Sequence, residues 1–220
     1  MAILSDLVEA VAEVEGIDPA TVGLFARYIR EAGLIATHGR GPSAAKMSLT
    51  DAANLLIGVN ATNVAADAAR VVKEYRRLQA LEFRSLLDPR PDDSRGALGD
   101  ALEELLRFAG GGELPDVFMD HAFDWGFQEA FARGDVFIEL RFRMSRPQVE
   151  LRMFELPGSD AVDPSDPDQY LLNIPPELSI VFRPLVQPRP SPRSKKRSGD
   201  RIEEARITRQ TLFAVGKLIG

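Results

Sequence analysis

The sequence contains no cysteine, so disulfide bonds and thiolate metal ligands are excluded. Its 220 residues include only two histidines, His38 and His121, which leaves few side chains for acid–base or metal chemistry. No apolar run is long enough to cross a membrane, and the first residues carry acids instead of the basic start of a signal peptide. These absences predict a protein of the reducing cytoplasm with no membrane partner.

The motifs of common catalytic sites are also missing. The sequence has no GxxxxGKS/T phosphate loop, no GxGxxG dinucleotide motif and no HExxH zinc motif. The densest group of possible metal ligands is Asp116, Asp120, His121 and Asp124. Phe127 and Phe131 fall on the same edge of the helix predicted there, which favours a solvated acidic edge over a metal site. We therefore expect no catalytic residue, no metal and no cofactor.

Charge is unevenly distributed along the chain. The net charge of −6 argues against a protein covered with nucleic-acid-binding surface. Residues 1–18 carry acids and no base, whereas residues 27–46 are basic with one acid, Glu31. The bases of this second stretch are Arg27, Arg30, Arg40 and Lys46. A local basic face on an acidic chain is typical of a small phosphate-contacting surface.

The first sixty residues predict three helices and a hairpin. Apolar spacing indicates a helix over 3–15, a second over about 19–32 and a third that begins at Thr50 or Asp51. Asp18 is placed to cap the second helix, and Gly33 to end it. A Gly-rich antiparallel hairpin is expected over 34–48. The second helix is amphipathic, with one side made of Val22, Phe25, Ala26, Ile29 and Ala32 and the opposite side of Gly23, Arg27, Arg30 and Glu31.

This order of a polar cap, a helix, the segment EAGLI and a hairpin with Gly and Arg at its tip resembles the winged helix-turn-helix of DNA-binding proteins. The resemblance covers about residues 3–59. It implies that the second helix enters the major groove while the hairpin, as the wing, contacts the DNA backbone. The DNA-contacting residues it implies are Thr21, Gly23, Arg27 and Arg30 on the helix and His38, Arg40 and Lys46 on the wing. The exposed face lacks Asn, Gln and Ser, so modest sequence specificity is expected.

A long helix is predicted over about 63–87. Val64, Val71 and Leu78 recur every seven residues, as in the seam of a coiled coil. Two interpretations stay open: a helix that packs on its own domain, or a helix that forms a homo-oligomer.

The second half of the chain predicts an α+β domain after a turn-rich linker. Helices are expected over 97–109 and 115–132, followed by a β-hairpin of strands 136–144 and 149–155. Further strands are expected over 178–182 and 204–208, and a closing helix over 209–219. We therefore divide the chain into a winged-helix domain (1–60), a connecting or oligomerisation helix (61–87), a linker (88–96) and a C-terminal domain (97–220).

Two surfaces of this second half offer weaker nucleic-acid hypotheses. Loops near 157–169 and 187–200 are predicted to be disordered, and the basic one could add phosphate contacts from Lys195, Lys196 and Arg197 or pair with the acidic one. The hairpin residues that could form a stacking platform for a single strand, unless the closing helix covers them, are Phe137, Arg141, Arg143, Arg152 and Phe154.

Taken together, the sequence predicts an α+β protein that binds double-stranded DNA without catalysis, as a transcriptional regulator and homo-oligomer. Two alternatives remain. One is a packaging component similar in architecture to phage small terminase subunits. The other is a protein-interaction adaptor built on a winged helix.

Overall fold

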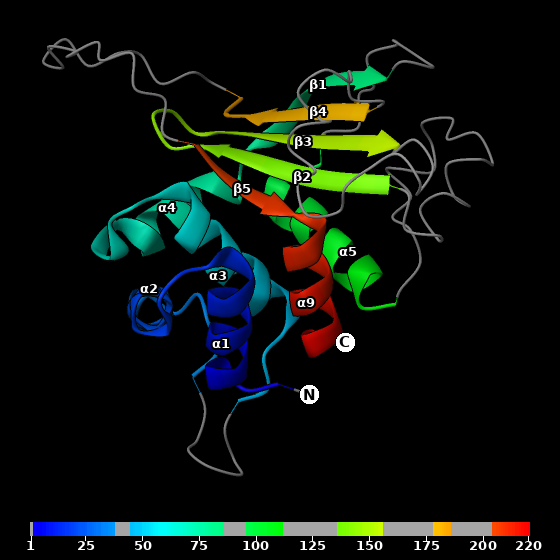
Figure 1. Cartoon of the computed structure of the whole chain (residues 1–220). Helices are drawn as coiled ribbons and strands as arrows, with labels where there is room; N and C mark the ends of the chain where they lie inside the picture. Colours follow the sequence, from blue (N-terminus) through cyan, green and yellow to red (C-terminus); the bar gives the residue numbers. More distant parts are fainter. Residues whose placement is uncertain (1, 38–44, 86–95, 112–135, 156–177, 186–203) are drawn as a thin grey trace, which may run out of the picture.

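A computed structural model of the chain describes residues 2–37, 45–85, 96–111, 136–155, 178–185 and 204–220. These residues form an α+β structure of six α-helices, one 3-10 turn and a five-stranded antiparallel sheet. Figure 1 shows the helices gathered on one side of the strands. Within the described residues, no helix is long and apolar enough to cross a membrane.

The three predicted N-terminal helices are confirmed as α1 (Leu4–Glu15), α2 (Pro19–Glu31) and α3 (Leu49–Ala61). Asp18 caps α2 as expected, because its carboxylate accepts a hydrogen bond from the backbone N–H of Thr21 at 3.0 Å. The cap of α3 is Ser48, one residue before the helix and earlier than predicted.

The arms of the predicted hairpin do not pair with each other in the described residues, where 34–37 and 45–48 carry no strand. The first arm is instead attached to α3, and the second to the segment that precedes α1. The N–H of Ala36 donates to Oδ1 of Asp51 at 2.9 Å, and the N–H of Met47 donates to the carbonyl of Ala2 at 2.9 Å. Residues 38–44, the expected tip, lie outside the described part.

The prediction of one helix over 63–87 is wrong. That stretch forms a 3-10 turn, a two-turn helix and a strand: η2 (Ala65–Asp67), α4 (Ala68–Tyr75) and β1 (Gln79–Ser85). Val71 and Leu78 of the proposed seam are buried in the chain's own core, whereas Val64 is 54% exposed. Val71 and Leu78 therefore pack inside the protein. The proposed seam provides no continuous apolar stripe against which a second copy could pack.

The predicted elements of the second half are confirmed wherever they are described. The sheet order is β1-β4-β3-β2-β5, with every neighbouring pair antiparallel. The bounds are α5 (Leu98–Ala109), β2 (Val136–Arg143), β3 (Gln148–Glu155), β4 (Leu178–Arg183), β5 (Glu204–Thr208) and α9 (Arg209–Ile219).

The buried side chains of the helices and of one sheet face form one continuous hydrophobic core. Alternation along β2 turns Ile138, Leu140 and Phe142 into this core, where α3 and α9 pack against β2 and β5. Helices α5 and α9 cross closely, because a Cβ built on Gly216 would lie 2.5 Å from the carbonyl oxygen of Leu106. The core thus joins the N-terminal helices to the C-terminal sheet.

Several predictions concern residues outside the described part. They are the domain linker over 88–96, the helix over 115–132 with its acidic and histidine residues, and the loops over 157–169 and 187–200 with Lys195, Lys196 and Arg197.

Candidate nucleic-acid interface

Helix α2 is held on the helical core by one apolar stripe. Val22, Phe25, Ala26 and Ile29 are buried, as their spacing predicted. Gly58 of α3 allows the close contact, since a Cβ built there would lie 2.5 Å from Cδ1 of Ile29. The position of α2 is therefore fixed by packing, and its opposite side is presented at the end of the molecule away from β1 (Figure 1).

The predicted contact residues of α2 lie on this opposite side. Thr21, Arg27 and Arg30 are exposed. Gly23 is half-buried, and a Cβ built on it would meet no atom within 4 Å. These four residues are thus accessible, with Thr21 and Arg30 on opposite flanks of the exposed side because they are nine positions apart.

Arg27 is paired with Glu31 one turn further along the same face. The guanidinium Nε lies 2.7 Å from Oε1 of Glu31, and this hydrogen bond raises the pKa of Arg27. A guanidinium has five N–H donors, so this single bond leaves others for a phosphate or a guanine. Both side chains are more than half exposed, so water and salt screen the attraction between them. A phosphate can therefore replace Glu31 at little cost.

Two residues of this face are missing from the sequence prediction. Leu24 is 45% exposed and Tyr28 is 37% exposed, and the two are one turn apart between Thr21 and Glu31. The helical period places Leu24 close to the centre of the exposed side, opposite the buried stripe. The same helical wheel that identified Arg27 could have identified both residues.

Of the predicted wing residues, Lys46 is described and exposed, whereas His38 and Arg40 lie outside the described part. Lys46 is adjacent to Met47, whose attachment to Ala2 fixes the returning arm. The first arm, residues 34–37, is held by the hydrogen bond from Ala36 to Asp51. Asp51 also accepts hydrogen bonds from the N–H and the hydroxyl of Ser48. Asp51 of α3 and Ala2, just before α1, therefore hold the bases of the two arms.

A chain of hydrogen bonds connects the segment that follows α2 to the rest of the protein. Buried Asn54 donates from Nδ2 to the carbonyl of Leu34 at 2.6 Å, and its Oδ1 accepts from Nη1 of Arg76 at 3.0 Å. Nη2 of Arg76 in turn donates to Oε1 of Glu103 at 2.6 Å. This chain of bonds links α3, α4 and α5 to the backbone just after α2.

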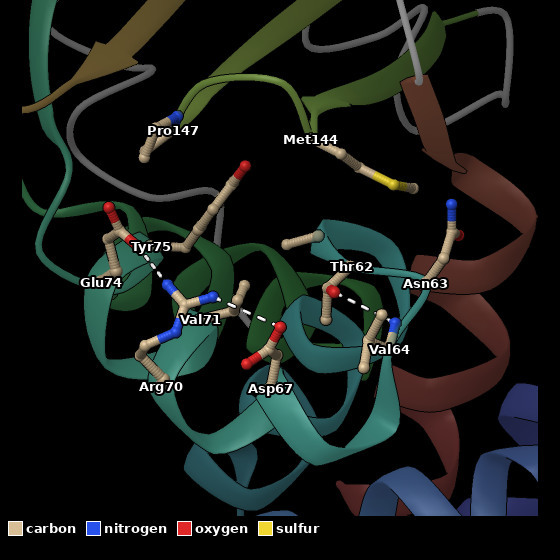
Figure 2. Close-up of a pocket in the computed structure, with 11 residues that line it drawn as sticks. Thr62, Asn63, Val64, Asp67, Arg70, Val71, Glu74, Tyr75, Met144 and Pro147 are labelled. Atoms are coloured by element: carbon tan, nitrogen blue, oxygen red, sulfur yellow. Dashed lines mark hydrogen bonds and ion pairs between the residues drawn. The ribbon is translucent and has the colours of Figure 1, made fainter. Parts of the chain in front are cut away.

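A hollow of about 400 Å³ lies between α4 and the turn that joins β2 to β3. Figure 2 shows Arg70 between Asp67 and Glu74 on one wall, with Met144 and Pro147 across from it. Arg70 pairs with both carboxylates, so its charge is engaged and one carboxylate is in excess. The hydroxyl of Tyr75 is also engaged, since it donates to the carbonyl of Arg143 at 2.7 Å. We therefore assign no ligand to this hollow.

The hypothesis of a stacking platform on the β2–β3 hairpin is wrong. Glu139 is 1% exposed and receives hydrogen bonds from Nε of Arg141 at 2.7 Å and Nη1 of Arg152 at 2.9 Å. Phe154 is fully buried. These arginines therefore balance a buried carboxylate. Helix α9 does not cover them, because its buried residues belong to the core on the other sheet face.

Among the described residues, no group of three or more His, Asp or Glu side chains is arranged to hold a metal ion. Comparison of the chain with protein-family models, with curated proteins and with solved structures finds no match.

Proposed function

We propose that this protein binds double-stranded DNA through the exposed side of α2 and acts as a non-catalytic transcriptional regulator. The observation that carries the proposal is the combination of the exposed Arg27 and Arg30 with the open space above Gly23. Long cationic side chains attract phosphates whatever the DNA sequence. A helix that lacks a side chain at one exposed position can lie closer to the base edges in the major groove.

Contacts within the folded chain do not explain why residue 23 is a glycine. Glycine inside a helix costs about 0.5–1 kcal/mol relative to alanine. Its backbone has an ordinary helical conformation, and no neighbour lies within 4 Å of the position a Cβ would take. A partner that approaches the backbone closely supplies a reason for the missing side chain. Duplex DNA against a recognition helix is such a partner.

A second candidate function, a protein-interaction adaptor, is favoured by one observation. Leu24 and Tyr28 present apolar surface on the same face, and exposed apolar residues on a helix are typical of helix–protein contacts. The two candidates differ in their response to salt. Binding to DNA weakens steeply as salt rises, whereas binding to an apolar protein surface does not.

The proposal is tested with labelled random-sequence duplexes in a fluorescence-anisotropy titration over a range of salt concentrations. The unsubstituted chain should bind at low salt. The double variant Arg27→Ala/Arg30→Ala should bind more weakly, with a salt slope reduced by about 0.9 for each arginine that contacts a phosphate.

The matched control is Arg107→Ala/Lys217→Ala, which removes the same charge from exposed positions on α5 and α9. This control should keep the slope of the unsubstituted chain. Equal loss of affinity in both variants would refute the assignment to α2. If no duplex binds at low salt, DNA binding is refuted and the adaptor function remains.

The mass in solution separates two roles in DNA handling. A dimer supports a regulator, and a ring-sized assembly supports a packaging component.

A further inference from the structure

The exposed side of α2 is unusual in the order of its side-chain sizes. Between the first residue of the helix and Leu24, the exposed positions carry small groups, namely Pro19, Ala20 and Thr21, and half-buried Gly23 carries no side chain. Leu24 is the first long side chain, and it is aliphatic and 45% exposed. The N-terminal half of the helix can therefore come close to a partner, with Leu24 as the one side chain that projects.

In helix-turn-helix docking, residues in the N-terminal part of the recognition helix contact the base edges. The side chains at this end of α2 offer few hydrogen-bond groups. The hydroxyl of Thr21 lies 3.4 Å from the carboxylate of Asp18, which it can use as an acceptor. This end of α2 therefore offers few side-chain groups for hydrogen bonds to base edges. It does offer apolar surface for contact with them.

We propose that Leu24 recognises the 5-methyl group of thymine in the major groove. This inference rests on the proposed DNA-binding function and adds a specificity-determining residue to it. The thymine methyl is the apolar group that unmodified DNA displays in the major groove, and side chains without polar atoms contact it. The glycine before Leu24 lets the helix backbone approach closely enough for the leucine to reach a base edge.

Arg27, one turn further along, complements this contact. Leu24 and Arg27 are neighbours on the helix surface, and arginine recognises guanine through two hydrogen bonds. The pair therefore favours sites in which thymine and guanine lie next to each other. Tyr28 flanks Leu24 on its other side and adds apolar surface to the same contact.

The test compares duplexes that contain thymine with duplexes that contain uracil, because uracil lacks only the 5-methyl group. A pool with a randomised central stretch is amplified with either thymidine or deoxyuridine triphosphate, and affinity is measured by anisotropy. Burial of one methyl predicts about fourfold weaker binding of the uracil pool by the unsubstituted chain.

Leu24→Ala should bind the thymine pool more weakly and bind both pools equally. The control Leu81→Ala, which removes an exposed leucine from β1, should keep the fourfold preference. Equal binding of the two pools by the unsubstituted chain overturns the role of Leu24 while DNA binding stands. A preference that survives in Leu24→Ala also overturns it, and failure to bind either pool refutes the DNA-binding function together with it.

Discussion

Replacing Gly23 with alanine should raise the stability of the protein and lower its affinity for DNA. The position lies inside α2, where alanine gains about 0.5–1 kcal/mol over glycine because less backbone entropy is lost on folding. The new methyl group meets no atom within 4 Å, so no packing cost opposes this gain. For a chain of this size the midpoint of thermal unfolding should rise by about 1–4 °C.

The opposite effect on DNA binding follows from the same methyl group. If the duplex approaches the backbone at Gly23, the added methyl overfills the interface, and overpacking typically costs 1–3 kcal/mol. Affinity for random-sequence duplexes should therefore fall about fivefold or more. Thermal unfolding followed by circular dichroism and anisotropy titration measure the two effects on one sample.

Gly216→Ala is the matched control for the stability effect. A Cβ at Gly216 would lie 2.5 Å from the carbonyl oxygen of Leu106 and 2.9 Å from Cβ of Ala109, so α5 and α9 would have to move apart. This variant should be destabilised by about 1–3 kcal/mol despite its gain in helix propensity. If Gly23→Ala is destabilised as well, or binds DNA as tightly as the unsubstituted chain, the reasoning about the open space on α2 is refuted.

Three further predictions concern caps and buried ionisable groups. Asp18→Ala should cost about 1 kcal/mol in urea unfolding through loss of the helix cap, whereas Asp18→Asn should keep the cap and bind DNA more tightly in anisotropy titration because a negative charge is gone. Burial raises the pKa of Tyr75 to about 12, and an unfolded tyrosine titrates near 10, so stability should fall as pH rises from about 10 to 12. Tyr75→Phe should show a shallower fall in urea unfolding over that range, and identical slopes would contradict the buried hydroxyl that donates to Arg143. Burial also raises the pKa of Glu15, opposed by its hydrogen bond from Thr211, so the folded state holds this proton more tightly than the unfolded state does. Glu15→Gln should therefore be more stable relative to the unsubstituted chain at pH 7 than at a pH below about 4, and a difference independent of pH would rule this out.

The N-terminal helices could be predicted from sequence because their signals are local. The cap at Asp18 and the apolar stripe of α2 involve residues only one to four positions apart. The capping box at Ser48 is equally local, and the predicted start at Thr50 or Asp51 lies just after the observed start at Leu49.

Strand β1 could not be predicted, because the interaction that makes it a strand is distant in sequence. Gln79–Ser85 pairs with Leu178–Arg183, about a hundred residues further along the chain. Val71 in α4 and Leu78 in the connection to β1 are seven residues apart, and both face the same core. The pattern identified Val71 and Leu78 as buried but not the exposure of Val64, and it did not show whether the partner is the same chain or another copy.

The candidate site was predicted in part, for a similar reason. The cations of α2 stand out against an apolar stripe, so Arg27 and Arg30 were found from the sequence. Leu24 and Tyr28 were missed because an apolar residue in a helix is normally assigned to the core. The helical wheel already places both residues opposite the buried stripe, and the structure shows that both side chains are exposed.

Photo-crosslinking tests the central claim, that the exposed side of α2 meets DNA, most directly. A photoreactive benzoylphenylalanine is introduced in place of Tyr28 and, in a second protein, in place of Leu81 on β1, which lies far from α2 (Figure 1). With a bound duplex at low salt, irradiation should join DNA to the protein from position 28 and not from position 81. Cross-links of equal yield from both positions, or none from position 28 while the duplex remains bound, would contradict the account.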